Sequence, residues 1–150
     1  MGNIGEQYLK LARSLFGRVI ACSRSEKNLS QLDQFYSLSQ RTDFFSQCDY
    51  LIICLPLTEE TMPLLKDESF YNQLRENVVI INLARGELFD ENQLCSFLKS
   101  HNKSCYLTDV TYPEPYPEDG VLSQLDQVFI TPHIGGRRED IWNLLIVKNN

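Results

Sequence analysis

The chain has 150 residues, of which 43% are hydrophobic and 23% are charged, and this balance is typical of one globular domain with a buried core. Its net charge of −6 argues against nucleic acid as a partner, since phosphate backbones bind to basic surfaces. No apolar run reaches the roughly 20 residues of a membrane span and no signal-peptide pattern opens the chain, so we expect a cytoplasmic protein outside the membrane.

Five cysteines are spread over the chain, an odd number without a CxxC pair. Several lie within apolar runs, as Cys54 does between Ile53 and Leu55, which is typical of free thiols in a reducing compartment. Because there are two histidines and the cysteines lack ligand spacing, we expect no metal site.

In chain order, the most apolar segments are short, rich in Val, Ile and Leu, and mostly continuous, which is typical of strands covered on both faces. The strands that we expect are 18–22, 50–55, 78–83, 105–110 and 128–131. Longer amphipathic segments alternate with them, and the expected helices are 4–16, 39–47, 68–74, 91–100 and 139–148. This alternation implies right-handed crossovers, so the sequence predicts an α/β fold with a doubly wound parallel sheet.

Two of these helices carry specific signals. We expect Asp90 to cap the helix 91–100, and Gly17 to end the helix 4–16. The apolar stripe of the first helix, which we expect to face the core, consists of Ile4, Tyr8, Leu11, Ala12 and Leu15.

The segment 111–120 reads Thr-Tyr-Pro-Glu-Pro-Tyr-Pro-Glu-Asp-Gly, and its prolines exclude a helix or a central strand. It follows directly after the strand 105–110. Ligands in open α/β sheets bind at the carboxyl ends of the strands, so we expect this rigid loop to border a site.

The chain opens with Met-Gly-Asn-Ile-Gly and continues directly into the first helix. Gly2 and Gly5 fit the second and third glycines of a GxGxxG motif, in which the backbone approaches a pyrophosphate and the helix packs closely on a strand. The alternative is a flexible tail, but the following helix, Gly17 and strand favour the motif. We therefore expect Gly2, Asn3, Ile4 and Gly5 to contact a nicotinamide dinucleotide.

About 20 residues after that motif, an NAD site normally places an acidic residue on the ribose hydroxyls. Here the strand 18–22 is followed by Ser23, Arg24 and Ser25. A carboxylate would repel a 2′-phosphate, whereas a guanidinium and hydroxyls bind one. We therefore expect NADP(H) to be favoured over NAD(H), the alternative being that Arg24 is a solvated surface charge.

Four segments carry a resemblance to a known family. They are Leu-Pro-Leu-Thr at 55–58 with Thr61, Ile-Asn-Leu-Ala-Arg-Gly-Glu-Leu at 81–88, Leu-Thr-Asp-Val-Thr-Tyr-Pro-Glu-Pro at 107–115, and Thr-Pro-His-Ile-Gly-Gly at 131–136. In this order they resemble the D-isomer-specific 2-hydroxyacid dehydrogenases, most of all the glyoxylate/hydroxypyruvate reductase branch. The resemblance implies hydride transfer between NAD(P) and a small 2-keto or 2-hydroxy acid.

Reduction of a 2-keto acid requires a cation for the substrate carboxylate. Arg85 follows a buried strand and precedes Gly86, so its guanidinium can reach into a crevice and hold a carboxylate through two hydrogen bonds. The local alternative is an ion pair with Glu87.

The same reaction requires an acid for the carbonyl oxygen. His133 follows the last strand, and an imidazole titrates close to neutral pH, whereas His101 lies in a polar stretch and is expected to be a surface residue. The resemblance assigns Glu114 and His133 to an acid–base pair, in which the carboxylate fixes the tautomer. It also disfavours a formate dehydrogenase, since those relatives carry Gln where Glu114 stands.

The resemblance further implies which residues contact the cofactor. Asp109 is assigned to the nicotinamide carboxamide, the alternative being a cap or turn residue. The other positions so implied are Leu55, Pro56, Leu57, Thr58, Thr61, Leu83, Ala84, Arg85, His133 and Gly135.

The sequence departs from the family pattern at its ends. The substrate domain, which the family builds mostly before the glycine motif, is absent, as is the strand that should lead into Gly2. We therefore expect residues 1–150 to form an incomplete NAD(P)-binding domain that lacks its first strand, is inactive alone and, as the resemblance implies, pairs as a homodimer. The alternatives are a non-catalytic fragment and a nucleotide-sensing module of the corepressor type.

Overall fold

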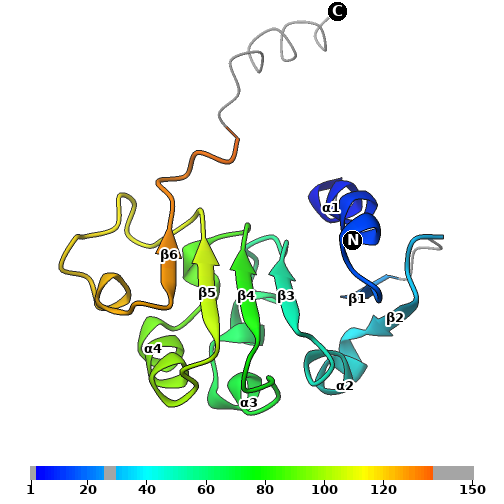
Figure 1. Cartoon of the computed structure of the whole chain (residues 1–150), viewed down its shortest axis with the longest axis horizontal. Helices are drawn as coiled ribbons and strands as arrows, with labels where there is room; N and C mark the ends of the chain where they lie inside the picture. The colour runs from blue at the N-terminus through cyan, green and yellow to red at the C-terminus, as the bar shows by residue number, and fades with distance from the viewer. Residues whose placement is uncertain (1–2, 26–29, 137–150) are drawn as a thin grey trace, which may run out of the picture.

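Short parallel strands form two separate sheets in the computed structural model, which describes residues 3–25 and 30–136 (Figure 1). The strands are β1 (Ile20–Ser23), β2 (Gln34–Ser37), β3 (Tyr50–Ile53), β4 (Val79–Asn82), β5 (Cys105–Thr108) and β6 (Val128–Ile130). One sheet pairs β1 with β2, and the other has the order β3-β4-β5-β6. Within the described residues, neither strand of the first sheet is hydrogen-bonded to a strand of the second.

Helices and turns connect these strands, as the alternation predicted. They are α1 (Asn3–Leu15), η1 (Leu38–Gln40), α2 (Arg41–Phe45), η2 (Met62–Leu65), α3 (Glu68–Tyr71), η3 (Gly86–Leu88), α4 (Glu91–Ser100) and η4 (Val121–Gln124). The helix expected at 91–100 has the predicted bounds, and the Asp90 carboxylate caps it by accepting from the amide of Gln93 at 2.9 Å. The helices expected at 39–47 and 68–74 are shorter, and the one expected at 139–148 lies outside the described residues.

The core is built around the four-stranded sheet. Phe70 of α3, Ile80 of β4, Leu88 of η3 and Leu98 of α4 are fully buried in it, and each such side chain contributes about 1.5–3 kcal/mol on transfer from water.

Cysteine behaves here as a small apolar residue. All five cysteines, each within the described part of the chain, are free thiols that are buried or half-buried, as their apolar surroundings predicted.

Two predictions about the first third of the chain are wrong. Of the stripe expected to face the core, Ala12 is buried as predicted, whereas Ile4, Leu11 and Leu15 are 60%, 64% and 73% exposed, and Leu9, which lies outside the stripe, is buried. The strand β2 was missed because one of its four side chains is buried, so its sequence lacks an apolar run.

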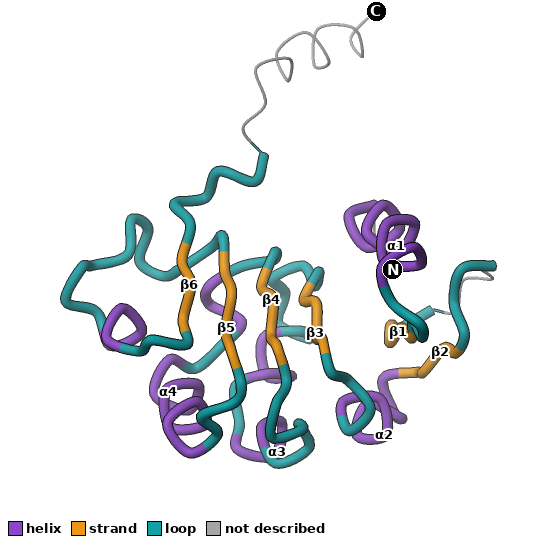
Figure 2. The backbone as a smooth tube through the Cα atoms, in the orientation of Figure 1, coloured by secondary structure: helices purple, strands orange, loops and turns teal. Residues whose placement is uncertain are grey.

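The carboxyl ends of the parallel strands place the loops of interest at one edge. Figure 2 shows β3, β4, β5 and β6 side by side, each continuing upward into a loop. These loops hold residues 54–61, 83–85, 109–120 and 131–136, and so contain most of the predicted site. In the described ranges, every helix is too short or too polar to cross a bilayer.

Candidate active site

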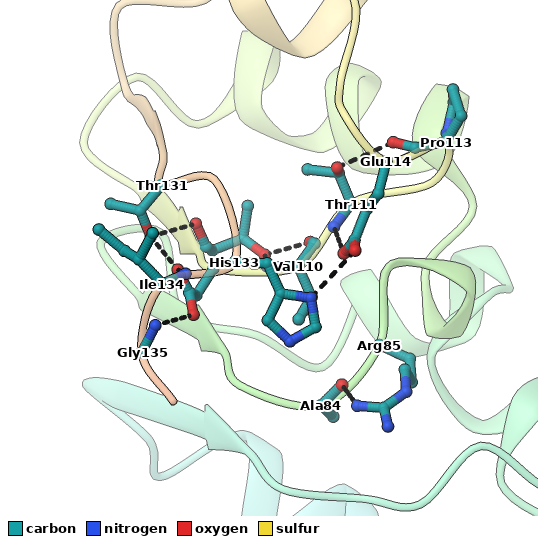
Figure 3. A network of polar contacts seen from close by, with 12 residues as sticks. Ala84, Arg85, Val110, Thr111, Pro113, Glu114, Thr131, His133, Ile134 and Gly135 are labelled. Atoms are coloured by element: carbon teal, nitrogen blue, oxygen red, sulfur yellow. Dashed lines mark hydrogen bonds and ion pairs between the residues drawn. The ribbon is translucent and has the colours of Figure 1, made fainter. Parts of the chain in front are cut away.

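The two residues that the resemblance assigns to an acid–base pair lie within hydrogen-bonding distance of each other in the structure. Nδ1 of His133, after β6, lies 3.0 Å from Oε2 of Glu114, in the loop after β5 (Figure 3). The other carboxylate oxygen of Glu114 accepts from the backbone amide of Thr111 at 3.0 Å. Because Nδ1 faces the carboxylate, Nε2 is the ring nitrogen left to exchange a proton with a substrate.

The electrostatics of Glu114 suit this arrangement. The hydrogen bond from His133 and then the amide of Thr111 hold the pKa of Glu114 below its ordinary value, and the positive charge of Arg85 adds to the effect. Glu114 therefore remains a carboxylate at neutral pH and can accept a hydrogen bond from Nδ1 of His133.

The loop that carries Glu114 is fastened to α4 by Tyr116, which the sequence did not single out. The half-buried Tyr116 hydroxyl donates to the carboxylate of Glu91 and accepts from the amide of Leu122 at 3.1 Å. Burial, followed by the hydrogen bond to Glu91, raises the pKa of Tyr116 to about 12, so it stays a donor through the neutral range. A single polar aromatic residue in a proline-rich loop gave no signal of this role.

The backbone of His133 adopts a left-handed conformation with φ of 50°. Asp109 holds this turn from the end of β5, accepting from Thr131 Oγ1 at 2.5 Å, the Ile134 amide at 2.9 Å and the Gly135 amide at 2.7 Å. The conformation costs on the order of 1–3 kcal/mol and persists only where neighbouring contacts fix it. Asp109 thus determines where the imidazole is placed.

The charge on Asp109 is favoured by these contacts. Partial burial raises its pKa, but the hydrogen bonds from Thr131, Gly135 and Ile134 outweigh burial and leave the pKa below the ordinary value. Both carboxylate oxygens of Asp109 accept hydrogen bonds from the loop that carries His133, and the sequence did not predict these contacts. The expected contact with a nicotinamide carboxamide stays a prediction.

Arg85 is positioned by Asn82, the last residue of β4, which sequence reasoning also missed. The fully buried Asn82 amide donates to the Arg85 carbonyl at 3.0 Å and to the Tyr106 hydroxyl at 3.1 Å, and it accepts from the Ala84 amide at 3.0 Å. A buried amide with its partners supplied fixes the local backbone. A polar residue that ends an otherwise apolar strand was the available signal.

The Arg85 side chain is exposed at the same edge as the acid–base pair (Figure 3). Its Nη1 donates to the Ala84 carbonyl at 2.6 Å, and in the described structure it forms no ion pair with Glu87. A Cβ on Gly86 would lie 2.3 Å from the carbonyl carbon of Thr111, so the glycine lets the loops of Arg85 and Glu114 meet backbone to backbone. In this arrangement the guanidinium can bind an anion, and the neighbouring imidazole–carboxylate pair can exchange a proton with that anion.

The residues expected to hold the phosphates and adenosine lie near the other sheet. Gly2 is outside the described residues, α1 begins at Asn3, Ile4 is exposed and Gly5 is buried. At the end of β1, the Ser23 hydroxyl donates to the Ser25 carbonyl at 2.8 Å, and Arg24 pairs with Glu60 at 2.6 Å.

The loop after β3 is internally bonded. The hydroxyl of the buried Thr61 donates to the Pro56 carbonyl at 2.5 Å and accepts from the Thr58 amide at 3.0 Å, so it shapes the loop. The remaining expected cofactor positions are half-buried Leu55 and Leu83, buried Ala84, and exposed Pro56, Leu57 and Thr58. The guanidinium and hydroxyls at the end of β1 are polar groups of the kind that contact a nucleotide, so these side chains are compatible with a nicotinamide dinucleotide.

Comparison with known proteins agrees with this geometry. The model of the D-isomer specific 2-hydroxyacid dehydrogenase NAD binding domain matches residues 1–135. A glyoxylate reductase of Pyrococcus horikoshii is 31% identical over 153 residues, covering 99% of this chain and 45% of the relative. A glyoxylate/hydroxypyruvate reductase A of Citrobacter koseri is 34% identical over 128 residues, covering 83% and 41%.

Solved structures show the same fold. The D-isomer specific 2-hydroxyacid dehydrogenase of Xanthobacter autotrophicus, in complex with NADPH and MES, superposes with a TM-score of 0.81 at 32% identity, over 94% of this chain and 58% of that one. The chain spans less than half the length of the two curated relatives named above. By its family match, its relatives and its sheet-edge site, the chain belongs to the D-isomer specific 2-hydroxyacid dehydrogenase family and represents its NAD-binding domain.

Proposed function

We propose that the protein reduces a small 2-keto acid of the glyoxylate or hydroxypyruvate type to a D-2-hydroxy acid, with NADPH favoured over NADH. The observation that carries this proposal is the His133–Glu114 pair at 3.0 Å, next to the Arg85 guanidinium. The relatives named above are glyoxylate and glyoxylate/hydroxypyruvate reductases, which supports this substrate class. No contact among the described residues favours the nucleotide-sensing alternative.

In the proposed mechanism the Arg85 guanidinium binds the substrate carboxylate through two hydrogen bonds and so orients the keto group. The cofactor, when bound, supplies the hydride for C2. Nε2 of the protonated His133 donates its proton to the carbonyl oxygen, which becomes the hydroxyl of the product. Glu114 stabilises the imidazolium before transfer and keeps Nδ1 protonated afterwards, so the ring is neutral when product leaves.

The cofactor preference rests on Arg24 with Ser23 and Ser25 at the end of β1, where an acidic residue would disfavour a 2′-phosphate. Asp109 is proposed to meet the nicotinamide carboxamide in addition to its contacts with the loop of His133. Pairing of two copies through this domain, activity only with a substrate domain, and a cytoplasmic location remain proposals from the family.

The decisive experiment is His133→Gln in the complete protein that the gene encodes, with His101→Gln as the matched control. His101 stacks on Phe97 with ring centroids 4.4 Å apart, away from Glu114. Since general acid catalysis contributes about 10²- to 10⁴-fold, His133→Gln should lower kcat by that factor while the Kd for NADPH stays the same. Near-normal turnover of glyoxylate in His133→Gln would refute the proposal.

A further inference from the structure

The cation expected to hold a 2′-phosphate already has an anionic partner within the chain. Nη1 of Arg24, after β1, lies 2.6 Å from Oε2 of Glu60, which belongs to the loop between β3 and η2. The side chains are 65% and 69% exposed, so an approaching solute can reach both charges. The contact connects the end of the β1–β2 sheet with a loop of the four-stranded sheet.

The backbone that presents Glu60 is fixed by its neighbours. The amides of Thr58 and Thr61 donate to each other's hydroxyls at 3.0 and 3.2 Å, and the amide of Met62 donates to the Thr58 carbonyl at 2.9 Å. The side chain of Thr61 is buried, which anchors the turn to the domain. The backbone of Glu60 therefore has a defined position, from which its carboxylate reaches Arg24.

A 2′-phosphate carries about −1.5 to −2 charge at pH 7 and would compete with Glu60 for the guanidinium, whose Nη1 already binds that carboxylate. The bound phosphate would also lie near the carboxylate, which repels it. NADH lacks this phosphate and so meets neither cost. Glu60 thus disfavours NADPH, whereas Arg24 favours it.

We infer that Glu60 is a specificity-determining residue, which lowers the selectivity for NADPH over NADH by holding Arg24. The inference rests on the proposed NADPH-dependent function. It predicts a protein that discriminates less between the two cofactors than Ser23, Arg24 and Ser25 alone would allow.

The test is the affinity for NADPH and NADH, measured by titration calorimetry on the complete protein without substrate. The variants are Glu60→Gln, Arg24→Ala and, as matched control, Glu59→Gln, which removes the same charge from the adjacent exposed residue. Because exposed ion pairs are weak, Glu60→Gln should tighten NADPH binding by about two- to fivefold, and salt should diminish the gain. NADH affinity should stay the same, and Glu59→Gln should change the ratio by less than half as much.

The outcomes separate the inference from the proposed function. Weaker NADPH binding in Arg24→Ala together with an unchanged ratio in Glu60→Gln would overturn the role of Glu60 and leave the function standing. Loss of NADH affinity in Glu60→Gln would assign Glu60 to the ribose hydroxyls and would also overturn the inference. Unchanged NADPH affinity in Arg24→Ala, or no binding of either cofactor, would refute the cofactor assignment itself.

Discussion

Replacement of Gly86 by Ala should separate the two loops on which the proposed chemistry depends. The added Cβ would lie 2.3 Å from the carbonyl carbon of Thr111 and 2.6 Å from both the Thr111 oxygen and the Tyr112 nitrogen. All three atoms belong to the backbone and cannot rotate away. Since carbon atoms pack at about 3.5 Å or more, the loops must move apart by about 1 Å.

This displacement should cost about 1–3 kcal/mol of unfolding free energy, the usual penalty for overpacking. It also moves Arg85 relative to Glu114 and His133, and a misplacement of about 1 Å costs about 10²-fold in rate. The assays are the urea midpoint at constant m-value and kcat/KM for glyoxylate in the complete protein.

Gly17→Ala is the matched control, because a Cβ at Gly17 meets nothing within 4 Å and its φ is not positive. That variant should stay within about 0.5 kcal/mol of the parent protein and keep its activity. If Gly86→Ala matched Gly17→Ala in both assays, the close approach of the two loops would not exist in solution.

Three further changes probe the contacts around the site. Asn82→Ala leaves buried backbone groups without partners and should lower the unfolding free energy by about 1–3 kcal/mol, measured by urea denaturation. Asp109→Ala should speed hydrogen exchange of the Gly135 amide at least tenfold, since that amide loses its acceptor. The pKa of Glu114 is depressed, so its contribution to stability is present above the ordinary value of 4.5 and is lost as pH falls through the folded value. Glu114→Gln should therefore flatten the acid slope of stability, whereas Glu118→Gln should not.

Each of these expectations can fail in a distinct way. An Asn82→Ala protein as stable as Asn102→Ala, which alters an exposed loop residue, would show that the buried amide contributes nothing. Unchanged exchange at Gly135 would mean that its amide has another acceptor. Equal acid slopes in the Glu114 and Glu118 variants would show that the hydrogen bond from His133 does not lower the pKa of Glu114.

Local signals predicted the regular elements well where one segment determines its own conformation. The helix α4 was predicted with its bounds and its Asp90 cap, because both depend on residues within a few positions of each other. The stripe of α1 was misjudged, since periodicity shows that Ile4, Leu11 and Leu15 share a face but not whether another element covers that face.

The site residues show the same difference between local signals and tertiary contacts. The family resemblance predicted Glu114 and His133, and their positions after strands predicted that they lie at one edge of the sheet. The contacts of Asp109 with the loop of His133 join residues up to 26 positions apart, and no local pattern records such a distance. The close approach at Gly86 likewise depends on how two loops meet after folding.

The division into two hydrogen-bonded sheets has a consequence for the order in which the protein opens. The β1–β2 sheet rests on four residue pairs, and a two-stranded unit is marginal by itself, whereas β3–β6 share a large core. Amides of β1 should therefore exchange with solvent through a local opening that leaves β4 protected. A dinucleotide that contacted both sheets would suppress this opening. The hydrogen-exchange rate of the β1 amides would then report cofactor binding, although β1 lies away from the reacting atoms.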